Sequence, residues 1–574
     1  MQRGKSDLIL EGVLRLEKFL HEMNATIATS PYLDRSRQPE TSPTTAPSLS
    51  RGSFSGSPLT EAHQGLQRRQ RTPLTEPDNP NNLENAVLDS SHTSTTESVL
   101  QWTHFDMFPS LRHDYVSIFH LEQSRPSVRT RTTTMYPYVT AGDVDEIIDS
   151  FEHAVNFWYP TMSRSQLKRT RAIIVNENFD EGGPDTCLAL LTMALGCASQ
   201  VVSGLKPGAA LSDEEQKRRA ARRTMGDMYF DSVLRKLHVA HTSVGSIATH
   251  CLFFVALYFA FLRRPLQAWE YINAASAKCL LLLSYPPQNE TPEDQERIRR
   301  IFWSCYILES DYLAELSSLP VSGIARIESS IPLPGDYHTH VAAQEQEQAS
   351  LYFLACISMR RLLNRVHQLL YARGTGASLD NARFPYIVAE LNHQLDEWRD
   401  VLPPAFAFSI GFDCEPTATE HGGFLRQRYL TCRSVIYRPY LMWVLSGAGA
   451  ATDLDAVGVG SGPASQDVLK SCKACLDACL LHILNLRGFA QTVLVDTWIC
   501  SLSMAGAMLV LLAACRIPSL RKLIGPEVLA AGGHLRQLLE GWQRVSGDPS
   551  SPSVNQSVRI IGEAESFIQQ VYQR

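Results

Sequence analysis

The side chains best suited to chemistry are the carboxylates of a short acidic segment, Asp145-Glu146-Ile-Ile-Asp149. Aspartates four residues apart lie on one face of a helix, and this spacing occurs in α-helical enzymes that bind Mg²⁺ to act on diphosphates. Such a metal clamp needs a second acidic cluster opposite the first, and Ser310 to Glu315 matches that requirement poorly. Acidic side chains also serve as dipole partners in the first turn of ordinary helices. An all-α, Mg-dependent enzyme that uses residues 145–149 is therefore kept as the alternative function.

A second candidate is the group formed by Cys472, Cys475 and Cys479. Their spacing places all three thiols on one helix face, so a metal would still need a fourth ligand from elsewhere in the chain. The apolar residues that follow, up to Leu484, continue an interior surface. We therefore predict a packed thiol face and no metal site. The other cysteines lie mostly singly in apolar runs, which is typical of reduced, buried intracellular thiols.

The remaining motifs with catalytic potential are weak. The glycines Gly458, Gly460 and Gly462 lack the spacing of a dinucleotide-binding loop and follow no predicted strand. His238, His241 and His250 lie along helical runs without a paired nucleophile or carboxylate. We predict no catalytic residue and no cofactor in this chain.

These groups must be positioned by helices, because apolar residues recur at helical spacing from about residue 143 onward and no convincing alternating strand is found. A capping box at Ser212 and Glu215 predicts one helix start. The fold class is therefore all-α, a large irregular multi-helix domain over residues 141–574. Outside residues 225–334, which we interpret as three helical runs and an extended tail, the predicted helices are Asp143–Tyr159, Thr186–Val202, Ser212–Leu237, Gln344–Tyr371, Ile387–Arg399, Phe424–Leu445, Ser465–Leu486, Val493–Cys515, 526–544 and 554–572.

Two different segments precede this domain. Residues 6–24 form a short amphipathic helix with a seam of apolar residues spaced four and three apart, which either pairs two chains as a coiled coil or docks on its own core. Residues 25–140 are predicted to be a mostly disordered linker, because their Ser, Thr and Pro content leaves little apolar area to bury. The seam consists of Ile9, Val13, Leu16, Leu20 and Met23.

Charge and hydropathy restrict the partners. The net charge of −6 argues weakly against direct nucleic-acid binding. A basic run in the long predicted helix is either a nuclear-import signal or an exposed helix face, and it consists of Lys217, Arg218, Arg219, Arg222 and Arg223. The apolar run Cys251–Leu262 is too short to cross a membrane, and Trp498–Cys515 is interpreted as a buried core helix. No membrane association is predicted.

The stretch from Met225 to Pro334 contains motifs that occur together in one known family. Its helix RRIFWSCYILESD resembles the signature RR-x-FW-x-x-Y-x-x-[DE]-R of the fungal-specific transcription factor domain, the middle homology region of fungal zinc-cluster transcription factors, with Ser310 in place of the last arginine. Further family motifs lie before and after this helix in the family's order, so that the resemblance spans residues 143–520. The signature residues, expected to be structural, are Arg299, Arg300, Phe302, Trp303, Tyr306, Glu309, Asp311, Pro320, Trp398, Pro403, Arg438 and Pro439. We expect Arg299 and Arg300 to pair with Glu309, Asp311 or helix carboxyl ends.

The resemblance implies a fungal, pathway-specific transcription regulator located in the nucleus, with a secondary-metabolite gene cluster as one candidate target. It also implies a homo- or heterodimer with other regulators, DNA contacted directly or through a partner, and a small-molecule effector. The family normally begins with six zinc-binding cysteines, whereas the first cysteine here is Cys187. Three explanations remain open: the protein modulates other regulators, an upstream exon with its zinc cluster is missing, or a basic segment contacts DNA.

Overall fold

The computed structural model confirms the all-α prediction, since its described residues contain helices and no strand. The predicted helices are recovered with ends shifted by a few residues, and Ser212 caps its helix by accepting a hydrogen bond from the Glu215 backbone N–H at 3.2 Å. The seam of residues 6–24 lies outside the described residues. The structure describes residues 96–128, 136–176, 179, 183–205, 211–316, 319–335, 337, 344–371, 383–413, 417–447, 463–486, 489, 491–493, 497–545 and 551–573.

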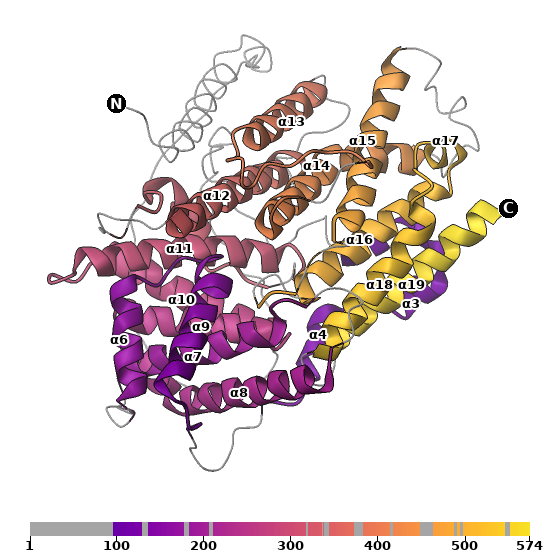
Figure 1. Cartoon of the computed structure of the whole chain (residues 1–574). Helices are drawn as coiled ribbons and strands as arrows, with labels where there is room; N and C mark the ends of the chain where they lie inside the picture. The colour runs from indigo at the N-terminus through magenta and orange to yellow at the C-terminus, as the bar shows by residue number, and fades with distance from the viewer. Residues whose placement is uncertain are drawn as a thin grey trace, which may run out of the picture. The chain divides into compact units, whose positions relative to one another are not determined.

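The first group of helices packs around two helices that are buried along almost their whole length, α7 (Pro184–Val202) and α9 (Ser246–Phe261). Both are apolar on every side, which is the pattern of an interior helix. They contact each other, and α7 also contacts α5 and α8 (Figure 1). The surrounding elements are α5 (Ala141–Phe151), a π-turn at Glu152–Asn156 (η4), α6 (Arg164–Val175), α8 (Asp213–Thr242) and α10 (Pro265–Ser284).

Helix α11 (Pro292–Leu313) links this group to the next, because it packs on α9 and α10 and also on α12 (Gln344–Tyr371). Helix α14 (Glu420–Gly447) then packs on α12, on α13 (Phe384–Asp400) and on α15 (Pro463–Asn485) (Figure 1). The 3-10 turn η5 (Ile324–Ser330) follows α11. The chain thus brings α11, α12, α14 and α15 together, although they are far apart in sequence.

The last helices form a layer that includes the long apolar helix α16 (Thr497–Cys515), which packs on α15, α18 and α19. By length and composition α16 and α7 could cross a membrane, but 83% and 94% of their apolar windows are buried inside the helical body. Burial therefore explains their hydropathy. The other elements of this layer are α17 (Pro518–Arg521), α18 (Val528–Val545) and α19 (Pro552–Gln573).

The predicted linker over residues 25–140 extends too far, because its last part is folded. Residues 96–123 form four short helical elements that pack on the C-terminal layer, where Thr96 donates to the Leu502 carbonyl at 3.0 Å and Gln556 hydrogen-bonds both backbone polar groups of Val116. The prediction failed here because helices of five or six residues are too short to show a period and are stabilised only by what they contact. They are α2 (Thr96–Leu100), η3 (Thr103–Met107), α3 (Pro109–His113) and α4 (Ile118–Gln123).

Candidate functional site

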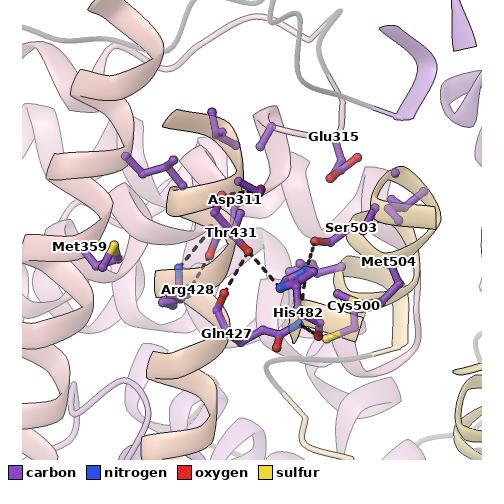
Figure 2. Close-up of a pocket in the computed structure, with 18 of the residues that line it drawn as sticks. Asp311, Glu315, Met359, Gln427, Arg428, Thr431, His482, Cys500, Ser503 and Met504 are labelled. Atoms are coloured by element: carbon purple, nitrogen blue, oxygen red, sulfur yellow. Dashed lines mark hydrogen bonds and ion pairs between the residues drawn. The ribbon is translucent and has the colours of Figure 1, made fainter. Parts of the chain in front are cut away.

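A cavity of about 150 Å³ lies where α11, α12, α14, α15 and α16 converge. Its wall is largely apolar, yet it contains an unusual number of charged side chains for a protein interior. Figure 2 shows Asp311 and Arg428 on one side of it, with Glu315, His482 and Ser503 also lining the space. Buried charge without a structural reason is often functional, so this cavity is the candidate site.

The carboxylate of Asp311 holds two guanidinium groups from two different helices. It accepts hydrogen bonds from Arg428 of α14 at 3.0 and 3.3 Å, one to each oxygen, and it also pairs with Nη2 of Arg360 from α12. Because a two-point arginine–carboxylate contact fixes direction as well as distance, Asp311 defines how α11, α12 and α14 meet. One carboxylate nevertheless neutralises only one of the two cations.

Arg360 is the most deeply buried of these charges, with 3% of its surface exposed. Burial and the neighbouring Arg428 lower the pKa of its guanidinium to about 9, so it remains cationic at neutral pH. Its Nε and Nη1 atoms are buried and have no hydrogen-bond partner among the described residues. An unpaired buried donor costs about 1–3 kcal/mol, so an acceptor that reached these atoms would be stabilised.

Glu315 and Arg438 also line the cavity. Burial raises the pKa of the Glu315 carboxyl to about 8, although the nearby Arg438 and a backbone hydrogen bond from Thr96 oppose the shift. The Oε2 atom of Glu315 is buried and has no hydrogen-bond partner within the described part of the chain. Glu315 is therefore mostly protonated at neutral pH, and the three arginines of the cavity outweigh its carboxylates.

One wall carries a series of hydrogen bonds between uncharged side chains (Figure 2). Burial lowers the pKa of His482 to about 3, so its ring is uncharged. The Thr431 hydroxyl donates to the Gln427 carbonyl at 3.0 Å, which leaves it to accept from Nδ1 of His482 at 3.4 Å. Nε2 then accepts from the Ser503 hydroxyl at 2.8 Å. These hydrogen bonds give both ring nitrogens of His482 a partner without adding charge to the cavity.

Substitution of Glu315 by Gln should change how stability depends on pH. The folded-state pKa of Glu315 lies above its value in an unfolded chain, so the folded protein keeps this proton while the unfolded chain loses it. Its contribution to stability is present below about pH 4.5 and is lost as the pH rises to about 8. Between pH 5 and 7 the wild type should lose about 2–3 kcal/mol more than Glu315→Gln. Urea unfolding at each pH measures this, with exposed Glu397→Gln as the control; parallel curves would contradict the assignment.

The signature arginines do not pair as predicted from the sequence. Arg299 donates to Glu296 at 2.6 Å and Arg300 donates to the same carboxylate at 2.8 Å, so the predicted pairing with Glu309 or Asp311 is wrong. Arg300 also donates to the Pro160 carbonyl at 2.8 Å and stacks over the Tyr337 ring. Arg300 thereby fastens α11 to the segment after η4 and to the loop after η5. Residues three and four apart face each other on a helix, so Glu296 is within reach of both arginines without any tertiary contact.

The aromatic signature residues are buried on α11, and their polar atoms reach backbone or side-chain partners. Trp303 donates to the Pro332 carbonyl at 2.9 Å, and Tyr306 accepts from Asn364 of α12 at 3.1 Å. Phe302 is fully buried beside Trp303. Buried aromatic rings with satisfied polar atoms are structural elements of a helix junction. These residues hold α11 in place beside the cavity.

The other signature residues lie around this junction. Glu309 accepts from the Ser322 hydroxyl at 2.7 Å, and Trp398 of α13 donates to Ser358 of α12 at 3.0 Å. Pro320 and Pro403 lie in loops. Of the twelve signature residues, Asp311 and Arg438 line the cavity.

Pro439 lies inside α14, where it has no N–H to bond the carbonyl four residues earlier. That carbonyl belongs to Val435, and the Tyr371 hydroxyl donates to it at 2.6 Å. Tyr371 is the last residue of α12, so the bond ties the end of α12 to the middle of α14. The proline therefore positions two walls of the cavity.

The acidic segment lies on α5, away from the residues that line the cavity. Asp145 pairs with Arg171 at the surface, and Glu146 contacts Gln200 at 3.1 Å and Arg222 at 3.3 Å. The carboxylate of Asp149 is 74% exposed. These contacts are ion pairs and hydrogen bonds within the folded chain, and no second acidic cluster faces them among the described residues.

The basic run lies on α8, and most of its charges have partners. Arg219 pairs with Glu215, Arg222 bridges to α5, and Arg223 pairs with Asp227 and stacks on a ring of α9. Arg218 is 66% exposed and Lys217 is also at the surface. The nuclear-import role stays a prediction, with Lys217 and Arg218 as its most accessible residues.

The three cysteines of α15 are buried, and Cys479 lines the cavity. The Cys475 thiol donates to the Ser434 carbonyl at 3.4 Å, which joins α15 to α14. No group of three potential metal-ligating side chains occurs within the described ranges.

The sequence patterns did not point to Arg360, Arg428 or His482, and they identified Glu315 only as part of a weak acidic segment. The sequence does contain a signal for Arg360. On α12, residues spaced four and three apart lie on one side of the helix, and three of the five in this row are polar. An arginine, an asparagine and a histidine on the core side of an otherwise regular helix indicate an internal polar site. This row of buried positions on α12 consists of Phe353, Ile357, Arg360, Asn364 and His367.

Comparison with known proteins agrees with the signature residues. Residues 149–400 match the model of the fungal-specific transcription factor domain. A protein of Aspergillus rugulosus named "Putative transcription factor ecdB" is 24% identical over 475 residues, covering 75% of this chain and 74% of the relative. No solved structure matches this chain. The matched range is shorter than the predicted 143–520 and ends at α13, so α14, α15 and α16 of the cavity lie beyond it. Over residues 149–400 the chain is therefore similar to the fungal-specific transcription factor domain.

Proposed function

We propose that this protein is a fungal, pathway-specific transcription regulator that acts through its helical body. The observation that supports this most strongly is the matched domain over residues 149–400, together with a similar relative named as a transcription factor. The signature residues of α11 have structural contacts, as expected for a regulatory scaffold. A secondary-metabolite gene cluster is the candidate target, and the nucleus is the proposed location.

We propose further that the protein is not an enzyme. Asp145 and Asp149 lie at the surface of α5 with ordinary ion-pair partners. A two-metal site requires converging carboxylates in a shaped, water-poor cavity, and these two side chains lie in neither. The cavity beside α11 and α12, in contrast, is lined by the buried charges of Arg360 and Arg438.

The partners are also part of the proposal. Residues 6–24 would pair this chain with a second copy or with another regulator, and sedimentation of the full chain with Leu16→Glu and Leu20→Glu would test the seam. DNA would be contacted directly or through that partner. The cavity would accept a small-molecule effector that selects between conformations of the helical body.

A complementation experiment tests the regulatory function against the enzyme alternative. Transcript levels are compared between a fungal strain lacking the gene and the same strain supplied with the wild type or with Asp145→Asn/Asp149→Asn. A regulator should restore one coherent set of transcripts in both cases, because neither carboxylate contributes to the buried core. Restoration by the wild type alone would favour the enzyme, and absence of any transcript change would contradict regulation.

A salt series then separates direct from indirect DNA contact. Purified full-length protein is mixed with promoter DNA from the affected genes. Direct contact should give binding that falls steeply with salt, with a slope of about −0.9 per neutralised phosphate. The variant Lys217→Ala/Arg218→Ala should reduce that slope if α8 contributes. Promoter occupancy in cells without binding in vitro would place the DNA contact in a partner chain.

A further inference from the structure

We propose that the cavity between α11, α12, α14, α15 and α16 binds a small organic carboxylate whose remaining part is compact and apolar. That such a ligand would act as an effector rests on the proposed regulatory function. That it binds does not, because binding is measured on the purified chain. Four features of the cavity support it: its charge balance, its unpaired donors, its apolar wall and its size.

The charge balance favours an anion. Three guanidinium groups line the cavity, from Arg360, Arg428 and Arg438, against the two carboxyl groups of Asp311 and Glu315. The summed charge of these five side chains is therefore positive even with both acids ionised, and it becomes more positive when Glu315 is protonated. A desolvated excess of positive charge is costly unless a counter-charge enters. An anionic ligand would supply that charge.

The unpaired donors favour oxygen atoms as the recognised group. Arg360 is 3% exposed, and Asp311 occupies its Nη2 atom, while its buried Nε and Nη1 atoms have no partner among the described residues. Guanidinium groups bind carboxylate oxygens strongly and with defined direction. The Oε2 atom of Glu315 also has no partner in the described part of the chain, and in its protonated form this carboxyl can donate a further hydrogen bond.

The wall and the volume restrict the rest of the molecule. Apolar side chains dominate the lining, including Met359, Leu363, Ile499 and Met504, and the ring of His482 is neutral. An apolar cavity of 150 Å³ in a protein is large enough for benzene, and this cavity has about that volume. A bare inorganic ion would leave the apolar wall unfilled. A compact hydrocarbon group with one carboxylate fits both the guanidinium groups and the apolar wall of the cavity.

Benzoate is the probe for this site, with benzamide as its uncharged counterpart and inorganic phosphate as the bare anion. Calorimetric titration of the purified full-length protein should give a Kd on the order of 1 mM for benzoate, since so small a ligand buries little area. Benzamide should bind at least tenfold more weakly. Equal binding of benzamide and benzoate would overturn the proposal, and so would phosphate binding as well as benzoate.

Two variants locate the site by different means. Arg360→Gln removes the unpaired donors but leaves the contact between Asp311 and Arg428 in place, so the protein should fold and its benzoate affinity should fall about tenfold or more. Ala507→Leu, on the α16 wall, fills the space without touching any charge and should abolish binding. Exposed Arg218→Gln is the matched control and should bind like the wild type. Unchanged benzoate binding in Ala507→Leu would overturn the proposal even if Arg360→Gln failed to fold. Because these titrations need no transcription readout, their failure is distinguishable from failure of the regulatory function.

Discussion

Replacement of Asp311 by Ala should cost about 3–5 kcal/mol of unfolding free energy, because it leaves two guanidinium groups buried without their shared carboxylate. Arg360 has no other ion-pair partner described, and Arg428 loses both of its bonds at 3.0 and 3.3 Å. A loss of this size is a large part of the 5–15 kcal/mol that typically stabilises a domain. Urea unfolding of the full-length protein at pH 7 measures it.

The control for this prediction is an exposed aspartate with a comparable partner. Asp145→Ala breaks the surface pair with Arg171, and it should leave unfolding almost unchanged because solvent screens that pair. Adding Arg360→Leu and Arg428→Leu to Asp311→Ala should recover much of the loss, since no buried cation then remains unpaired. A small effect of Asp311→Ala alone would mean that water reaches both guanidinium groups.

Substitution of Gly196 by Ala should also destabilise the protein, by about 2 kcal/mol or more. Gly196 lies on α7, where α5 crosses it so closely that an added Cβ would meet the Ile147 side chain at 2.6 Å and its backbone carbonyl. A backbone carbonyl in a packed helix cannot turn aside as a flexible side chain can. Helix α5 would therefore have to move away from α7. Thermal or urea unfolding measures the loss.

Gly541→Ala is the matched control, because it makes the same chemical change at an interior helical position of α18. An added Cβ there meets nothing within 4 Å. Alanine should therefore stabilise this helix by up to about 1 kcal/mol through its higher helix propensity. The two substitutions are expected to have opposite signs. Equal stabilisation at both positions would show that α5 and α7 can separate at no cost.

The position of the cavity has a consequence for how an effector would act. Asp311 and Arg360 belong to the matched range 149–400, whereas Arg428, Arg438 and His482 come from helices that follow it. A ligand between them would contact both parts of the helical body at once. Its binding energy would then favour the conformation in which the two parts are closed on each other, which is the requirement for a ligand-controlled regulator.

Periodicity and local motifs were enough to predict the all-α fold and to find the similarity to the fungal-specific transcription factor domain. Helical periodicity and continuous apolar runs identify the long helices, because an interior helix must be apolar on every side and a surface helix on one side only. The signature of α11 is likewise local, since its arginines and aromatic residues lie within a few turns of one helix. Short helices such as α2 and α4 escaped prediction because their stability comes from the C-terminal layer that they contact.

Which charges meet depends on how the helices pack together. Arg299 and Arg300 had several carboxylates within reach along the chain, and the fold assigns them to Glu296. Asp311 was identified as part of a motif, but its two partners come from α12 and α14, 49 and 117 residues away. Ion pairs and cavities depend on distances between helices, and the spacing of residues along one helix contains no information about those distances. Hydropathy therefore predicted the helices, whereas the packing of those helices created the charged cavity between them.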